Sequence, residues 1–389
     1  MGPKVILGRA SWRDLACESS LAAGIEFVRA SRKACRVLLH PGQHVELPDA
    51  GISSGSGSSA QSFAQALGRT KYWAAPIDLV LLPDPVFITK SSLIITRDQR
   101  IYDELTYDIY SAKLWEDLIV ADGHLHLSDW YSERIKDPKI IKGLSIIVHP
   151  RWHKIYMHWL CEALAALCDP ASQIDSFSNI CVPNGPEFQM CSLEMATAIK
   201  SRLHVLDAPL YQFEIAAIPT HILARTWTHP AAIPGLVDFA SRTTLEGGAP
   251  SGEAELIYLS REDASARKMV NEPELAEALT NLGFTKIIAS DLNYRDQVRI
   301  FSRAKFMISP HGSGLTNLLF MGSGKQVLEL RPMYAGSRGR LWDRSYHILA
   351  ALTAKKYSVV VNENDPNIED WACEISHLLP IVESILRAF

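Results

Sequence analysis

The sequence lacks the features that mark secreted, zinc-bound and membrane-spanning proteins. Its seven cysteines are an odd number with no Cys-x-x-Cys pair, so neither a disulfide framework nor a structural zinc site fits, and reduced thiols are expected. The N-terminus has no basic region followed by a sustained apolar run, and no window approaches the roughly 18 apolar residues that cross a bilayer. These absences predict a cytoplasmic protein, or at most one that lies on the inner face of a membrane.

Missing charge and missing motifs exclude further classes. A net charge of −4 gives no global positive field, so no nucleic-acid partner is expected. There is no Asp-x-Asp, so we predict no metal clamp for a diphosphate and no cofactor. A Gly-x-Gly-x-x-Gly after the first strand of either half is also absent, which makes a dinucleotide dehydrogenase a distant alternative. What is present is 389 residues, 47% of them hydrophobic, enough for two domains with sizeable cores.

The order of predicted elements in the first half indicates an α/β domain. Strands and helices alternate there, which is typical of a parallel sheet. The predicted elements are a strand at 145–148, a helix at 156–167, a strand at 180–182 and a helix at 187–200. Nearer the N-terminus, short strands are predicted within 86–95. A Gly- and Ser-rich segment, 51–59, is interpreted as a flexible surface loop.

Proline and glycine gather between residues 230 and 252, which places the predicted boundary between domains 1–235 and 236–389. After it, five strands alternate with helices. The strands are predicted at 254–259, 284–288, 305–309, 326–330 and 356–361. Such a doubly wound domain binds its ligand at the carboxyl ends of its strands. The final helix, 368–388, packs either on its own domain or back on the first.

A glycine turn follows the strand at 305–309 directly. Gly312 and Gly314 let the backbone turn and approach a ligand closely, and the helix that begins there directs its free N–H groups at the gap. This geometry suits a diphosphate, although a simple capping turn is an equal alternative from these residues alone. The other candidate ligand contacts in the turn are His311, Ser313, Thr316 and Asn317.

Charged residues near the same strand ends strengthen the prediction of a nucleotide site. Glu329 ends an apolar strand, where a carboxylate accepts ribose hydroxyls in dinucleotide folds. Arg261 follows the first strand of this domain, and Arg267 comes shortly after it, so both are candidate phosphate ligands. Ordinary surface positions are the alternative for each.

The stretch 258–331 resembles the signature region of glycosyltransferase family 61, the DUF563 group that includes capsular polysaccharide biosynthesis proteins. The matching residues are 258–261, Arg267, Asn271, Glu272, Gln297, 310–320 and 327–330. The family usually has alanine where this chain has Ser313. Several ordered motifs over about seventy residues are more specific than any single one.

The resemblance implies a GT-B-like fold, with two Rossmann-type doubly wound domains facing a cleft. It implies an inverting glycosyltransferase that uses a nucleotide-sugar donor, UDP-linked sugars being favoured. The acceptor would be a hydroxyl of a glycan or lipid-linked glycan, in surface polysaccharide biosynthesis. Nothing in the sequence fixes an oligomeric state.

His158 and Glu162 lie four residues apart on the helix predicted over 156–167, so they share one face. The rest of that face is small, which suggests a cleft wall, whereas a structural histidine bonded to its own helix is the commoner outcome. Members of the resembled family show a similar His-Trp-x-x-Glu element, although many carry Asn where this chain has Ile155. The contribution of that Asn then comes from Lys154 or His153, or is absent. An inverting transfer needs a base near neutrality, and we assign His158 this role with Glu162 orienting it, or Glu162 itself.

Two alternative functions remain at the level of the sequence. A nucleotide-sugar epimerase shares the two-domain architecture, and a non-catalytic protein would bind the donor without consuming it. The basic stretch 134–154 suits contact with anionic lipid headgroups, while ordinary surface lysines beside a buried strand are the alternative.

Overall fold

The computed structural model describes residues 6–54, 58–102, 118–121, 124–222, 229–246, 255–332, 344–363 and 370–389. The chain divides into two compact units. Unit 1 comprises Met1–Gln43 and Ala74–Leu236, and unit 2 comprises His44–Trp73 and Val237–Phe389. The predicted boundary near 235 therefore falls one residue from the observed crossing, inside helix α7 (Ile233–Glu246). The prediction of an unbroken first domain is wrong for residues 44–73, which build part of unit 2.

Unit 1 contains a mixed sheet, in which the described strands number 13. Its strands are β1 (Ile6–Ala10), β2 (Ala16–Glu18), β3 (Cys35–His40), β7 (Ile77–Pro83), β8 (Val86–Ile88), β9 (Leu93–Ile95), β10 (Arg100–Tyr102), β11 (Leu118–Ala121), β12 (His124–Leu127), β13 (Lys139–Ile147), β14 (Asn179–Pro183), β15 (Leu203–Leu206) and β16 (Leu210–Pro219). Its helices include α1 (Leu21–Ser31), α3 (Asp129–Arg134), α4 (Tyr156–His158), α5 (Ala165–Cys168) and α6 (Glu187–Met195).

Only part of this sheet has the parallel order that the alternating pattern predicts. Strands β15, β14, β13 and β16 run parallel, and their βα connections carry the candidate base. Strands β7 and β8 pair antiparallel with β16, and hairpin strands continue the sheet from there. The prediction of a Rossmann-type, doubly wound first domain is therefore wrong, because the short strands before residue 130 join the same sheet rather than forming a separate layer.

Unit 2 is a doubly wound parallel domain, as predicted. Its strands are β17 (Leu256–Ser260), β18 (Thr285–Ile288), β19 (Phe306–Pro310), β20 (Gln326–Pro332), β21 (Lys356–Asn362) and β5 (Gly51–Ser54), and its helices include α2 (Ser58–Leu67), α8 (Glu272–Asn281), α9 (Tyr294–Arg303), α10 (Ser345–Leu352) and α11 (Ile375–Leu386). A two-stranded ribbon, β4 (Gln43–Glu46) with β6 (Lys71–Ala74), frames the inserted segment. The main sheet runs in the order β18-β17-β19-β20-β21-β5, with every neighbouring pair parallel.

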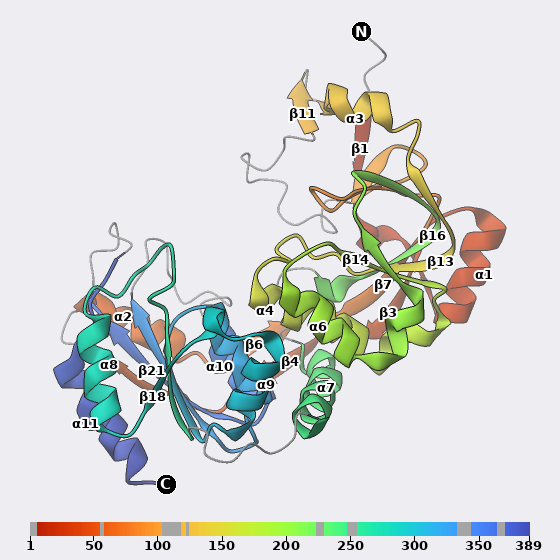
Figure 1. Cartoon of the computed structure of the whole chain (residues 1–389). Coiled ribbons are helices and arrows are strands. Elements are labelled where there is room, and N and C mark those ends of the chain that lie inside the picture. The colour runs from red at the N-terminus through yellow and green to blue at the C-terminus, as the bar shows by residue number, and fades with distance from the viewer. Residues whose placement is uncertain are drawn as a thin grey trace. The chain divides into compact units, whose positions relative to one another are not determined.

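Helices cover both faces of this sheet (Figure 1). Leu275 of α8 and Leu378 of α11 belong to one buried cluster with the strands, while Phe63 of α2 packs against Val359 and Val361 on the other face. The final helix thus packs on its own unit. The segment 51–59 was predicted as a flexible loop, yet Gly51–Ser54 is the edge strand that pairs with β21. The small side chains of this segment predicted a loop. They form a strand because β21 supplies the backbone hydrogen-bond partners, so β5 needs few large side chains of its own.

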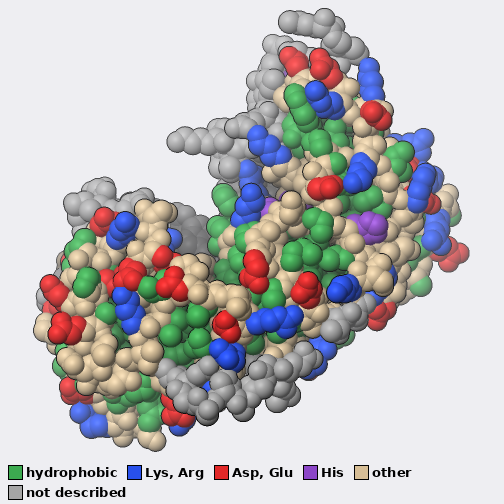
Figure 2. Space-filling model, in the orientation of Figure 1, with side chains coloured by type: hydrophobic (Ala, Val, Ile, Leu, Met, Phe, Trp, Pro, Cys, Tyr) green, Lys and Arg blue, Asp and Glu red, His purple; other side chains and the backbone are tan. Residues whose placement is uncertain are grey.

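On the face drawn in Figure 2, basic and acidic side chains of the described residues are interspersed over both units. Lys139 in the basic stretch pairs with Asp207 (Nζ–Oδ1 3.2 Å), and the Arg134 guanidinium stacks on Trp130. Among the described residues no helix has the length and hydrophobicity that a membrane span requires.

Candidate active site

The carboxyl edge of the unit 2 sheet brings together the glycine turn and the first arginine. Counted within 256–362, the strand order is 2-1-3-4-5, so the order in which strands are added reverses between β17 and β19. In doubly wound sheets the ligand lies at this reversal, outside the carboxyl ends of the strands. Arg261 directly follows β17, and His311 and Gly312 directly follow β19. The structure therefore places the predicted phosphate-binding residues at the expected position.

Arg261 lies across the glycine turn. Its Nη1 donates a hydrogen bond to the main-chain carbonyl of His311. A Cβ at position 312 would lie 2.7 Å from Arg261 Nε and 2.8 Å from Cζ, and one at 314 would lie 3.0 Å from Leu259 Cδ2. Gly312 has an extended backbone, with φ 172°, so the requirement for glycine there is room for the guanidinium and not backbone freedom.

Glu272 holds the end of β17 in place beneath this arginine. One carboxylate oxygen, Oε1, accepts hydrogen bonds from Tyr258 Oη (2.9 Å), Ser260 Oγ (2.7 Å) and the Arg261 main-chain N–H (2.9 Å). Glu272 is buried, so each of these donors would be costly to leave unsatisfied. Glu272 belongs to the resemblance drawn from the sequence, which gave it no role. In the structure it accepts the hydrogen bonds that hold the end of β17.

Glu329 does not face a ligand, and its predicted contact with ribose hydroxyls is wrong. The side chain is fully buried. Its Oε1 contacts His311 Nδ1 and accepts from Arg331 Nη1 (3.2 Å), and its Oε2 accepts from Tyr357 Oη. Burial alone would raise the pKa of Glu329, but His311, Arg331 and Tyr357 lower it. Glu329 is therefore an ionised support for His311. Arg331 lies two residues after Glu329 in β20 and so on the same face of the strand, which the sequence could indicate. The contact with Tyr357 of β21 could not be predicted from the sequence.

His311 and Arg267 lie close together above this support. The pKa of His311 is lowered to about 4, chiefly by burial and also by the charges of Arg331 and Arg267, while Glu329 opposes this shift. The His311 ring packs edge-on against Tyr346, with centroids 5.5 Å apart. Arg267 adopts a left-handed backbone, φ 60°, and its carbonyl accepts from Trp371 Nε1 (3.3 Å). His311 is therefore neutral near pH 7, with Arg267 as the nearby positive charge.

The helix after the turn is a 3₁₀ helix, η12 (Ser313–Phe320), instead of an α-helix. Thr316 and Asn317 are fully buried in it, so their predicted contacts with the donor are not supported. Asn317 Nδ2 donates to Gln297 Oε1 (3.1 Å), which fixes the start of α9. His311, Ser313 and Gly314 are the partly exposed members of the turn, and the N–H groups at the start of η12 remain the anion-binding feature.

The second predicted group, His158 and Glu162, forms the expected pair in unit 1. His158 Nδ1 lies 2.7 Å from Glu162 Oε1. The His158 side chain is 24% exposed and that of Glu162 is 3% exposed. Burial raises the pKa of Glu162, and the contact with His158 partly opposes this. Since Glu162 is sealed from solvent, only His158 can reach an acceptor.

The helix that carries this pair contains a π segment, η4 (Trp159–Leu164). Such segments are rare and concentrate at functional sites. Cys161, Ala165 and Ala166 are fully buried, so the small face predicted to be a cleft wall instead packs inside unit 1. The register shift of the π segment is what the 3.6-residue periodicity could not show.

Several polar residues lie beside this helix, of which the sequence singled out only His153, as a substitute for the family's Asn. His149 and His153 lie in the loop between β13 and α4, with ring centroids 4.9 Å apart. The buried Gln189 of α6 contacts His153, and Ser92 Oγ lies 2.8 Å from His149 Nδ1. Paired histidines so close to His158 in sequence are a signal that could have found them.

A second group of histidines in unit 1 surrounds the carboxylate of Asp169. His40 and His221 both bond Asp169 Oδ2, at 2.8 and 2.9 Å. Although burial alone would raise the pKa of Asp169, these two contacts hold it well below its usual range. Across the described part of the chain, no three His, Cys, Asp or Glu side chains are arranged to bind a metal.

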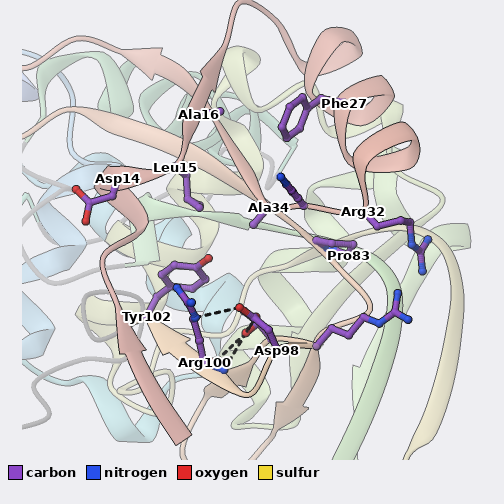
Figure 3. Close-up of a pocket in the computed structure, with 13 residues that line it drawn as sticks. Asp14, Leu15, Ala16, Phe27, Arg32, Ala34, Pro83, Asp98, Arg100 and Tyr102 are labelled. Carbon is purple, nitrogen blue, oxygen red and sulfur yellow. Dashed lines mark hydrogen bonds and ion pairs between the residues drawn. The ribbon is translucent and has the colours of Figure 1, made fainter.

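A cavity of about 790 Å³ lies between α1 and the β9–β10 turn (Figure 3). Its arginines are paired: Arg32 and Arg97 share Asp84, and Arg100 Nε lies 3.0 Å from Asp98 Oδ2. Strand β7 ends at this cavity, at the opposite end of the sheet from the carboxyl end of β13, because β16 is parallel to β13 and antiparallel to β7. The cavity therefore does not adjoin His158.

Comparison with known proteins finds a family whose model overlaps the candidate site. The model of the family Glycosyltransferase 61 matches residues 140–328, which include the His158 helix, Arg261 and the glycine turn. This confirms the resemblance drawn from residues 258–331.

Curated relatives match a shorter stretch. The chain is 36% identical over 90 residues to Protein O-linked-mannose beta-1,4-N-acetylglucosaminyltransferase 2 of Canis lupus familiaris, covering 22% of this chain and 15% of that protein. It is 34% identical over 88 residues to the EGF domain-specific O-linked N-acetylglucosamine transferase of Mus musculus, covering 21% and 16%. The matches thus span under a fifth of these relatives' lengths. A solved structure, the iron-containing dodecameric glycosyltransferase TibC from E. coli, aligns over 74% of this chain and 81% of that one, at 10% identity and a TM-score of 0.30, too low to support an argument.

Proposed function

We propose that this chain, whose residues 140–328 match glycosyltransferase family 61, is an inverting glycosyltransferase. It moves a sugar from a nucleotide-sugar donor to a hydroxyl of a glycan or lipid-linked glycan. The observation that carries the proposal is that Arg261 lies across Gly312 at the point of the unit 2 sheet where the strand order reverses. That arrangement places a guanidinium and the amides that begin η12 where a diphosphate binds in doubly wound domains.

The acceptor hydroxyl is activated by His158. Its Nδ1–H donates to the Glu162 carboxylate, which leaves a lone pair on Nε2. Nε2 takes the hydroxyl proton as the oxygen attacks the anomeric carbon. The new C–O bond forms on the face opposite the diphosphate, whose C–O bond breaks, and the nucleoside diphosphate leaves with the electron pair. The anomeric configuration is inverted.

Burial of Glu162 makes this pair a better base. An isolated negative charge is unfavourable in a buried site, so the pair gains when the acceptor proton brings it to neutrality. The raised pKa of Glu162 expresses this preference. Glu162 therefore orients His158 and increases its tendency to take the proton, without touching the acceptor.

Charge on the leaving diphosphate is met by fixed groups of unit 2. Arg261 is anchored by Glu272 at its main chain and by the His311 carbonyl at its guanidinium. Arg267 lies beside His311, and the first amides of η12 add partial positive charge. These groups stabilise the charge without a metal ion in the proposed mechanism.

The remaining parts of the proposal follow from the family. The donor would bind to unit 2, and the acceptor would bind to unit 1. Because the relatives are named as N-acetylglucosamine transferases, UDP-N-acetylglucosamine is the first donor to test. Cytoplasmic surface-polysaccharide synthesis, with peripheral contact at the membrane, is the proposed setting.

A transfer assay tests the proposal. Purified protein is incubated with UDP-, GDP-, CMP- and dTDP-sugars and a panel of p-nitrophenyl glycosides, and both nucleotide release and product anomers are measured. We expect one donor class to be consumed, an inverted anomer, and a loss of about 100-fold or more in His158→Ala. His204→Ala, which changes an exposed histidine of the same unit, is the control. Isomerised donor without nucleotide release would point to an epimerase, and binding without turnover to a non-catalytic protein; either result contradicts the proposal.

A further inference from the structure

The loop between β13 and α4 carries a second histidine, His153, five residues before the proposed base in the sequence. The main-chain N–H of His153 bonds the Pro150 carbonyl (3.0 Å), and that of Ile155 bonds the Trp152 carbonyl (2.8 Å). Two consecutive turns thus lead into the helix that carries His158. The positions of both imidazoles are fixed by this short, hydrogen-bonded connection.

Gln189 determines which nitrogen of His153 carries the proton. The side chain of Gln189 is fully buried, and its Nε2 lies 2.5 Å from the His153 carbonyl oxygen and 3.2 Å from His153 Nδ1. The amide nitrogen has two hydrogens, one for each acceptor. In this orientation Nε2 bonds both acceptors of His153, and Gln189 Oε1 is buried without a hydrogen-bond partner. A flipped amide would set that oxygen against the His153 carbonyl. Nδ1 therefore carries no proton, and neutral His153 has its proton on Nε2.

The surroundings keep this arrangement in place. Gly185 gives the amide its room, because a Cβ there would lie 2.1 Å from Gln189 Oε1. The His149 ring packs against that of His153 at an interplanar angle of 60°. Burial lowers the pKa of His153 to about 4, with the charge of Lys154 adding to the effect. His153 is therefore a neutral donor near pH 7.

His158 has the opposite arrangement. Its Nδ1 faces the Glu162 carboxylate, so Nδ1 carries the proton and Nε2 accepts. Both histidines are partly exposed, and no described residue bonds Nε2 of either one. The chain therefore carries an N–H donor at His153 Nε2 and, five residues later, a lone pair at His158 Nε2.

We propose that His153 binds the acceptor, its Nε2–H donating to an oxygen of the acceptor sugar while His158 takes the proton of the attacking hydroxyl. The inference rests on the proposed function. It makes His153 a residue that selects for a polyhydroxyl acceptor over water, because water offers no second oxygen at a fixed distance from the attacking one.

The kinetic test separates transfer to a sugar from transfer to water. With the donor and p-nitrophenyl glycoside found active, His153→Ala should raise the acceptor KM about tenfold, the value of one hydrogen bond. Slow hydrolysis of the donor in water should stay within about twofold of wild type. His153→Asn keeps an N–H donor and should recover part of the affinity, and His204→Ala should change nothing. An unchanged acceptor KM, or an equal loss of transfer and hydrolysis, overturns the inference.

A second test needs no substrate. Long-range ¹H–¹⁵N spectra of histidine-labelled protein distinguish the two neutral tautomers, and His153→Asn and His158→Asn assign the signals. We expect Nε2–H for His153 and Nδ1–H for His158, with His153 losing its single tautomer in Gln189→Leu. The reverse tautomer at His153 overturns the inference even if transfer is normal. A wild-type protein that transfers no sugar removes the proposed function, and this inference with it.

Discussion

At Gly312 a side chain of even one carbon would collide with the guanidinium of Arg261. The Arg261 guanidinium occupies the space a side chain would need. This need for glycine could be predicted from the sequence, since a Gly-x-Gly turn after a strand signals close approach. Its cause could not, because the sequence does not say that the approaching group is an arginine from fifty residues earlier.

Gly312→Ala should therefore weaken nucleotide binding without unfolding the protein. The new methyl group displaces Arg261 and costs a charge-assisted contact to phosphate, so we expect the Kd of the bound nucleotide to rise at least about tenfold. Isothermal titration calorimetry measures it. Gly322→Ala is the matched control, since a Cβ there meets only the flexible Lys325 side chain at 3.4 Å. Equal Kd values in the two variants would contradict this account of the turn.

Glu162 is the residue whose role the sequence left open and burial resolves. Spacing predicted the pair correctly, but spacing cannot tell which member is sealed from solvent. For Glu329 the sequence misled, because a carboxylate in an apolar strand looks the same whether it meets a ribose or a buried histidine, arginine and tyrosine.

Glu162→Gln should lower the transfer rate by roughly 10²-fold and move the acid limb of its pH profile. The carboxylate favours the protonated form of the pair, so its removal lets the pair stay deprotonated to lower pH. The limb should accordingly shift to lower pH. Profiles of kcat/KM between about pH 5 and 9 reveal it, with Glu187→Gln, at an exposed glutamate of unit 1, as control. A limb that does not move would mean that Glu162 does not act through proton affinity.

Among the elements, β17 depends on a side chain from the following helix. Glu272 begins α8 and satisfies three donors at the strand end. The strand and the helix were both predictable from periodicity and from Pro273 at the helix start. Their connection through one buried carboxylate was not, because it depends on how the strand end and helix start meet in space.

Glu272→Ala should lower the unfolding free energy of unit 2 by about 2–4 kcal/mol, since three buried donors lose their acceptor. Urea denaturation followed by tryptophan fluorescence measures the change. Glu274→Ala alters an exposed glutamate in the same helical turn and should change stability by less than about 0.5 kcal/mol. A small effect at both positions would show that water replaces the carboxylate at no cost.

Two further elements could not be predicted from local sequence patterns. The π segment at Trp159–Leu164 and the edge strand Gly51–Ser54 both depend on tertiary packing. Serine and glycine in 51–59 favour a loop when read locally, yet β21 offers an open strand edge. Long-range pairing of this kind carries no period in the sequence.

For the whole molecule, the pattern of alternation predicted unit 2 well and unit 1 only in part. Parallel strands separated by helices are regular, whereas the antiparallel hairpins that complete the first sheet resemble independent short strands. The insertion of residues 44–73 into unit 2 cannot be predicted from order along the chain, because it breaks the rule that neighbours in sequence fold together.

Buried neutral histidines in both units should make the whole chain acid-sensitive. Burial lowers the pKa of His149 to about 3, and those of His153 and His311 to about 4, from 6.5. Below pH 6.5 the unfolded chain therefore binds protons that the folded chain does not, and the unfolding free energy falls as the pH drops toward 4. Urea midpoints should decrease from about pH 7.5 to 5, less steeply in His311→Asn and unchanged in slope in His204→Ala. A midpoint that rises with acid would contradict the buried, neutral state of these rings.

The most direct measurement of the central claim is nucleotide binding by unit 2 in the intact chain. Titration calorimetry with UDP, GDP, CMP and dTDP, and with their sugars, would be run on wild type, Arg261→Ala and the exposed-site control Arg387→Ala. The account predicts that one nucleotide class binds wild type and the control equally, and that Arg261→Ala binds at least about tenfold more weakly. Binding of none of these ligands to a folded wild-type protein, or equal binding to Arg261→Ala, would contradict a donor site at the carboxyl edge of the unit 2 sheet.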